Sequence, residues 1–179
     1  KKTITYELPI PHSVSKIAPK HYSYCSLGHD ILLTGGLYLE DKTASRDAFR
    51  LNMKNSSVKA LKPMTFMRMQ HSMVQVEELR QAIVVGGVDS NGKALCDCEM
   101  YSQDTREWSE ICPLNESGAS LGLIKFVVES KTNRKLKLYC FGKTTIERMD
   151  LLTDTARPYW EKLKVVVPEP LNLGTCCVQ

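Results

Sequence analysis

An apolar run that ends in glycine recurs about every fifty residues in this chain and constrains its fold more than any other feature. Residues 31–36 read Ile-Leu-Leu-Thr-Gly-Gly, and residues 83–87 read Ile-Val-Val-Gly-Gly, with the glycines 51 positions further on. Residues 138–142 read Leu-Tyr-Cys-Phe-Gly and form a third copy, in which we align Phe141 with the first glycine. A period of this length indicates a repeat architecture.

The second half of each unit repeats as well. Residues 98–108 contain a short apolar segment, a polar turn and a tryptophan that opens a further segment. Residues 49–51 and Val58 take these places in the first copy, and residues 146–151 and Trp160 take them in the third. Each unit therefore holds four short apolar segments separated by turn residues, without helical periodicity. A unit of four antiparallel strands is a propeller blade.

This pattern resembles the Kelch repeat, in which two glycines close the second strand, a tyrosine lies in the third and a tryptophan in the fourth. Gly86, Gly87, Tyr101 and Trp108 match the pattern within one unit, whereas the first unit lacks the tryptophan and the third lacks one glycine. The repeat residues that we expect to be structural are Gly35, Gly36, Gly86, Gly87, Tyr101, Trp108, Gly142 and Trp160.

The resemblance implies an all-β propeller built from Kelch-type four-stranded antiparallel blades. Complete blades are expected at about residues 20–66, 70–116 and 120–168. Residues 1–19 would end a preceding blade, and residues 169–179 would begin a following one. Because propellers close with about 4–8 blades, we expect the chain to be one segment of a longer protein.

Binding residues are expected in loops that a rigid propeller presents on one face. In Kelch proteins that bind peptides, the loops between the second and third strands and those between blades often line the pocket. The positions that correspond to these loops are Lys20, Tyr38, Arg46, Arg68, Asn91 and Lys93. Beside Arg68, the apolar Phe66, Met67 and Met69 are expected to pack beneath a blade junction rather than face a partner.

The sequence offers little sign of catalysis or metal binding. Cys96 and Cys98 would share one face of a strand, but no second pair has the spacing of a structural zinc site. The four histidines form no HxxxH or HExxH motif, and neither a GxSxG motif nor a phosphate-binding loop occurs. We therefore predict no catalytic residue, no metal and no cofactor, although some Kelch propellers are copper oxidases.

Composition points to a cytoplasmic protein without a membrane or nucleic-acid partner. The formal charge of +4 comes from 24 basic and 20 acidic residues scattered along the chain, too small an excess to indicate nucleic-acid binding. No apolar stretch is long enough to span a membrane. The number of cysteines, seven, is odd, and their spacing does not suggest a disulfide framework, which favours a reducing compartment.

The function predicted on these grounds is a non-enzymatic protein-interaction module, acting as a component of a larger cytoskeletal or ciliary assembly. Its partners would be other proteins bound through the loops of the propeller face. One alternative is the substrate-recognition propeller of a cullin-RING ubiquitin ligase adaptor, which usually carries an additional BTB or F-box domain. A second alternative is an oxidase of the Kelch type.

Overall fold

Three four-stranded antiparallel sheets make up the computed structural model, which describes residues 21–129, 134–152 and 158–164. We call the sheets blades 1, 2 and 3. Blade 1 holds β1 (Ser23–Leu27), β2 (Asp30–Thr34), β3 (Ala48–Asn52) and β4 (Ser57–Ala60). Blade 2 holds β5 (Ser72–Val76), β6 (Gln81–Val85), β7 (Cys98–Ser102) and β8 (Trp108–Ile111), with a 3-10 turn, η2 (Glu77–Leu79), between β5 and β6. Blade 3 holds β9 (Gly122–Glu129), β10 (Arg134–Phe141), β11 (Ile146–Asp150) and β12 (Trp160–Leu163). The predicted fold class is confirmed.

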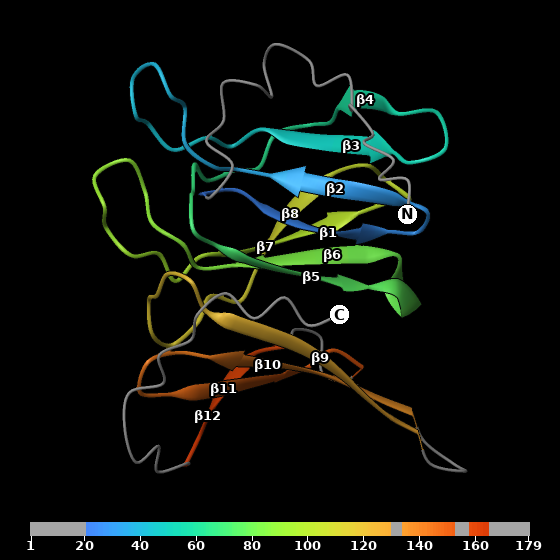
Figure 1. Cartoon of the computed structure of the whole chain (residues 1–179). Coiled ribbons are helices and arrows are strands. Elements are labelled where there is room, and N and C mark those ends of the chain that lie inside the picture. Colours follow the sequence, from blue (N-terminus) through green and yellow to red (C-terminus); the bar gives the residue numbers. More distant parts are fainter. Residues whose placement is uncertain (1–20, 130–133, 153–157, 165–179) are drawn as a thin grey trace, which may run out of the picture.

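Within each blade the strands pair in chain order, so that every blade is a meander of hairpins (Figure 1). The first strands of successive blades lie beside each other, β1 against β5 and β5 against β9. Hydrogen bonds support these contacts, because the hydroxyls of Ser23 and Ser72 donate to the carbonyls of His71 and Leu121. This arrangement brings the corresponding loops of the three blades to the same end of the molecule.

The backbone shows how the three units correspond. Gly35, Gly86 and Gly142 hold the same place, because the amide of each donates to the carbonyl just before the third strand, at 2.8, 3.2 and 2.8 Å. The alignment that put Phe141 at the first glycine is therefore wrong by one residue. Phe141 is the last residue of β10, and Lys143 stands where blades 1 and 2 have their second glycine.

Glycine is required at Gly35 by both conformation and space. Its φ is +61°, a region that residues with a Cβ seldom adopt. A Cβ there would lie 2.5 Å from the backbone oxygen of Arg68 and 2.6 Å from Cε1 of His71. The end of β2 thus passes directly against the connection that leads into blade 2.

Aromatic packing joins blades 1 and 2. Tyr101 is 2% exposed, and its ring centroid lies 5.1 Å from that of Trp108. Both pack in a cluster with Leu27 and Leu32 of blade 1. The indole N–H of Trp108 donates to the carbonyl of Lys62 at 2.8 Å, which satisfies the polar end of this large side chain. The aromatic pair on blade 2 therefore covers the neighbouring sheet.

A larger apolar cluster joins blades 2 and 3. Trp160 of β12 is 3% exposed and lies in this cluster. The remaining buried members are Val76, Ile83, Val85, Cys98, Leu114, Leu136, Leu138, Cys140 and Met149. Burial of this set in one continuous cluster fixes the two sheets against each other.

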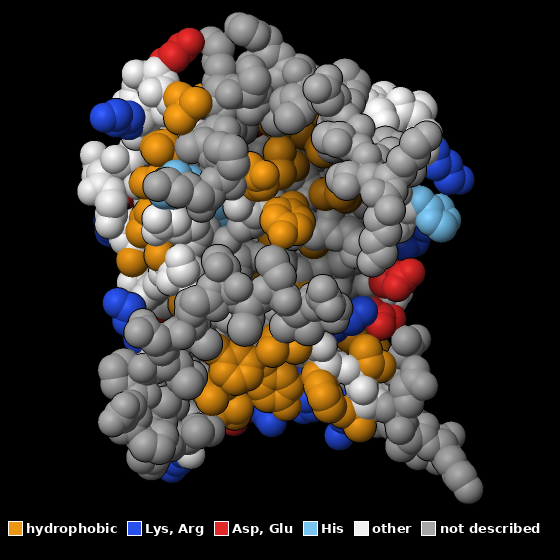
Figure 2. All heavy atoms as spheres, viewed as in Figure 1, with side chains coloured by type: hydrophobic (Ala, Val, Ile, Leu, Met, Phe, Trp, Pro, Cys, Tyr) orange, Lys and Arg blue, Asp and Glu red, His pale blue; other side chains and the backbone are white. Residues whose placement is uncertain are grey.

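The third blade leaves apolar side chains uncovered. Along β9, Ile124, Phe126 and Val128 are 39%, 56% and 40% exposed. The ring of Phe126 stands edge-on to that of Tyr139, with centroids 6.5 Å apart. Figure 2 shows hydrophobic side chains gathered over this blade. A row of exposed alternate residues is the pattern of a sheet face that another layer usually covers.

The partial blades expected at residues 1–19 and 169–179 lie outside the described residues. The strands of the three sheets fall within the ranges 20–66, 70–116 and 120–168, while the division of the whole chain into blades stays a prediction. In the described part of the chain, no helix has the length and apolar character needed to cross a membrane.

Candidate functional site

Loops of all three blades meet at one end of the molecule, which we call the loop face (Figure 1, left). It comprises the loops between second and third strands, residues 35–47, 86–97 and 142–145, and the connections between blades, residues 61–71 and 112–121. The loops of blades 1 and 2 touch, because the amide of Ala44 donates to Oγ of Ser90 at 2.9 Å. The loops of blades 1 and 2 therefore form one connected part of the loop face.

Aspartates hold the two long loops in shape. The carboxylate of Asp41 accepts hydrogen bonds from the backbone amide and the hydroxyl of Thr43, at 3.0 and 2.7 Å. These bonds lower the pKa of Asp41, the hydroxyl having the larger effect. Asp89 accepts the amides of Asn91 and Lys93 at 2.8 and 2.9 Å. Such short-range bonds are typical of ordered turns and give the loops a fixed conformation.

Between the loops of blades 1 and 2 lies a depression of about 600 Å³, which we call the junction groove. Phe66, Met67 and Leu95 give it an apolar lining, and Met67 is 53% exposed. Its polar lining residues are Arg46, Thr65, Asp89, Ser90 and Asn91. An apolar lining bordered by a few charged and amide groups suits a peptide segment better than a small charged metabolite.

The structure brings two of the predicted binding residues together. Arg46 and Asn91 come from successive blades and both line the junction groove, with exposed side chains. Lys93 is exposed on the same loop as Asn91, outside the groove lining. Tyr38 is half-buried, and its hydroxyl donates to Asp47 at 2.6 Å. Lys20 lies outside the described residues.

Arg68 does not face a partner, contrary to the prediction. Its side chain is 0% exposed, and its guanidinium donates to the carbonyls of Gly86 and Asp97 at 2.8 and 2.9 Å and to Oε1 of Glu99 at 2.9 Å. Desolvation of this cation is offset by the equally buried carboxylate. Arg68 thus holds blade 1 to blade 2 from within.

Its neighbour Met67 shows the opposite outcome. The sequence favoured packing beneath the junction for Phe66, Met67 and Met69, yet Met67 is half exposed and Phe66 lines the groove beside it. The apolar residues of the groove were therefore not predicted as binding residues, and neither were Thr65, Asp89 and Ser90 of its polar lining. The signal of Phe66 and Met67 was present, as two large apolar residues in a polar connection, but nothing in the sequence showed which way they point.

The cysteines of the described part form no disulfides, and burial keeps most of their thiols protonated. Burial raises the pKa of Cys25 to about 12 and that of Cys98 to about 12, which disfavours thiolates at neutral pH. Cys98 donates to the carbonyl of Cys96 at 3.5 Å. Within residues 21–129, 134–152 and 158–164 no three His, Cys, Asp or Glu side chains are grouped so that they could hold a metal ion.

These features define the class of the protein, a β-propeller seen as three consecutive blades. Residues 81–115, which cover most of blade 2, match the family model described as the Kelch motif. The chain is thus a propeller segment that carries a Kelch motif in its second blade.

Among solved structures, the one described as "Structure of YjhT" is similar, with a TM-score of 0.61 and 14% sequence identity. The match covers 83% of this chain and 53% of the YjhT chain, so the present chain spans about half the length of that protein. At this identity the similarity concerns the fold alone. Comparison with curated proteins gave no match.

Proposed function

We propose that this chain is a non-enzymatic protein-interaction module that binds a partner protein through its loop face. The observation that carries the proposal is the junction groove, where an exposed methionine, a phenylalanine and two predicted binding residues from different blades come together. The fixed conformation of the two long loops supports this proposal, because a preformed surface loses little conformational entropy on binding. The Kelch motif in blade 2 also supports the proposal, because Kelch repeats generally mediate protein–protein contacts.

Within this class we favour a scaffold of a cytoskeletal or ciliary assembly in the cytoplasm. The free cysteines of the described residues support a reducing compartment. A ubiquitin ligase adaptor is the alternative, and it would be recognised by a BTB or F-box domain on the same polypeptide. Among the described residues, no group of side chains of the kind that binds a metal favours the oxidase alternative.

The experiment compares the proteins that co-purify with two charge-changing double variants when each is affinity-purified from the cells that naturally contain the protein. Arg46→Glu with Met67→Asp changes the junction groove. Lys54→Glu with Met53→Asp makes the same kinds of change on the β3–β4 turn, at the opposite end of the blade, where Met53 is 50% exposed. We expect at least one protein to be reduced about tenfold or more by the groove variant and retained by the turn variant.

Circular dichroism would show that both variants keep their strands. If quantitative mass spectrometry finds no protein that separates the groove variant from the turn variant, the loop face is not the binding surface and the proposal fails.

A further inference from the structure

The two blade junctions share backbone features, but the arginine of the first is a glycine in the second. Arg68 and Gly118 hold the same place in successive connections, since their carbonyls accept the amides of Gly36 and Gly87, at 3.0 and 2.7 Å. The residue two positions further on has a positive φ in both connections, 54° and 52°. The second junction therefore has the backbone of the first without its arginine side chain.

The carboxylate that pairs with Arg68 has a counterpart in the second junction. Glu99 accepts the amides of Thr65 and Phe66 at 2.6 and 3.2 Å in addition to its bond from the guanidinium. Both Glu99 and Arg68 are 0% exposed. In the first junction, a buried carboxylate that accepts two backbone amides thus also binds a guanidinium.

Glu147 repeats the arrangement. It is 3% exposed and accepts the amides of Asn115 and Glu116 at 2.9 and 3.0 Å, together with the side-chain amide of Asn115 at 2.7 Å. Among the residues that the structure describes, no lysine or arginine contacts its carboxylate. The three N–H donors solvate this buried carboxylate but leave its negative charge without a contacting cation, which a bound guanidinium would supply.

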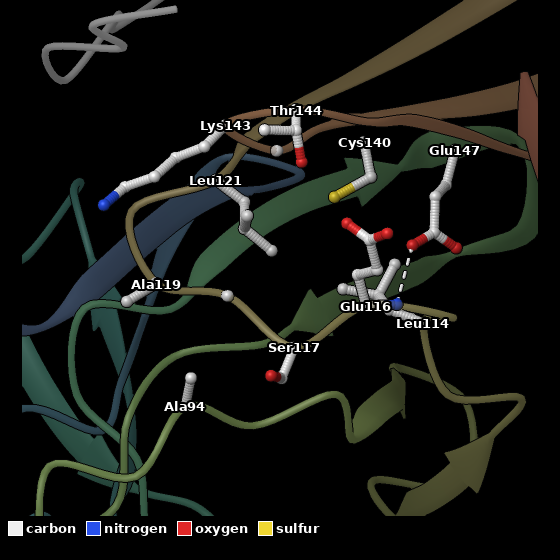
Figure 3. A pocket seen from close by; sticks show the side chains of 12 residues that line it. Ala94, Leu114, Glu116, Ser117, Ala119, Leu121, Cys140, Lys143, Thr144 and Glu147 are labelled. Carbon is white, nitrogen blue, oxygen red and sulfur yellow. Dashed lines mark hydrogen bonds between the residues drawn. The ribbon is translucent and has the colours of Figure 1, made fainter. Parts of the chain in front are cut away.

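A pocket of about 330 Å³ occupies the place left by the missing side chain. Gly118, Glu147 and Gly142 all line it. Figure 3 shows the carboxylates of Glu116 and Glu147 on the same side of the pocket, while the chain of Lys143 extends away from them. The backbone carbonyls that accept from Arg68 in the first junction correspond here to those of Gly142 and Thr145.

We propose that this pocket binds the guanidinium group of an arginine side chain from a partner protein. The guanidinium would donate to Glu147 and to the carbonyls at the ends of β10 and β11, as that of Arg68 does one blade earlier. A planar guanidinium has five N–H donors that point in different directions, so it can reach a carboxylate and two separate carbonyls at once better than an ammonium can. The pocket opens on the loop face, yet the inference does not depend on the junction groove.

The test is titration calorimetry of the whole chain with acetyl-Gly-Arg-Gly-amide. Matched peptides replace the arginine with citrulline, which has the same shape without the charge, or with lysine. We expect the arginine peptide to bind at least about tenfold more tightly than either. Equal binding of the citrulline or lysine peptide would overturn the assignment to a guanidinium. A further titration uses free arginine as the ligand. If free arginine binds as tightly as the peptide, the ligand of the pocket is a free metabolite and not a partner protein.

Two variants locate the site. Glu147→Gln keeps the shape of the side chain and one of its two acceptor oxygens but removes the charge. It should weaken binding of the arginine peptide about tenfold or more, and circular dichroism would show that the variant folds. Glu161→Gln, on β12 with a half-exposed side chain, removes the same charge from the same sheet and should leave binding unchanged. Equal affinities of these two variants would overturn the proposal.

A third variant fills the pocket from within. Gly118→Arg places an arginine where the first junction has Arg68, and the closest obstacle to its Cβ is the side chain of Leu121, at 2.6 Å, which can rotate. We expect this variant to fold, as circular dichroism would show, and to lose detectable binding of the arginine peptide. Unchanged binding by the folded variant would show that the peptide binds elsewhere.

Discussion

At the scale of single residues, the ionisable groups of the first blade junction are neutral or paired because water is excluded. The ring of His71 is 4% exposed, and its Nε2 lies 2.9 Å from Oγ1 of Thr34. Burial, helped by the nearby charge of Arg68, lowers the pKa of His71 from 6.5 to about 3. The folded protein therefore holds this histidine neutral under conditions in which the unfolded chain protonates it.

From this shift we predict a loss of stability in mild acid. Between pH 6.5 and about 3 the unfolded state binds one more proton at this position, so the free energy of unfolding falls as the pH falls. The slope from this one group approaches about 1.4 kcal/mol per pH unit. Urea denaturation at several pH values would measure it in the wild type and in His71→Gln, which cannot take up the proton.

The difference in slope between the two proteins isolates His71 from the carboxylates that titrate in the same range. Identical slopes would contradict a neutral buried histidine.

At the scale of the element, the ends of β2 and β6 lie directly against the connection between blades 1 and 2. Gly28 and Gly35 have nearly the same φ, 65° and 61°, but only Gly35 is crowded. A Cβ on Gly28 would have no atom within 4 Å, whereas one on Gly35 would meet the backbone of the connection. The two glycines therefore separate conformational strain from steric overlap.

Alanine at these two positions should give different losses. Gly28→Ala adds left-handed strain and should lower the free energy of unfolding by about 1 kcal/mol. Gly35→Ala adds the same strain and must also displace backbone, which should raise the total loss to about 3 kcal/mol. Thermal or urea unfolding would measure both, and equal losses would show that the connection yields without cost.

Strands were predictable from the sequence because the same pattern returns about every fifty residues and needs no knowledge of tertiary contacts. The register of the third copy was not predictable, since a single glycine remains at Gly142 and either of two positions fits it. The connection between blades 1 and 2 was harder still, because an irregular backbone has no periodicity. Met67 and Arg68 are neighbours with opposite exposure, and Arg68 is buried on account of Glu99, which is 31 positions away.

At the scale of the whole molecule, the third of the three described blades carries a row of exposed apolar side chains. Ile124, Phe126 and Val128 of β9 have exposed apolar side chains on one face of this strand. An exposed row of this kind favours association between copies, because burial of apolar area is favourable and lacks direction.

We predict that the 179-residue chain by itself associates as its concentration rises. Phe126→Lys should shift the equilibrium toward the monomer, whereas Met53→Lys, which changes a half-exposed apolar residue on the β3–β4 turn, should not. Size-exclusion chromatography with light scattering across a hundredfold dilution, a range of about 2.7 kcal/mol in association free energy, would follow the mass. A wild-type chain that stays monomeric throughout would contradict this prediction.

The exchange of arginine for glycine between the two junctions has an evolutionary consequence. Glycine codons of the form GGN and arginine codons of the form CGN differ by one base. A single mutation at position 118 could therefore seal the pocket with an internal guanidinium, and the reverse mutation at position 68 would open a new one. Blade junctions that share this backbone can thus gain or lose a receptor site for a partner in one step, while the sheets on either side stay as they are.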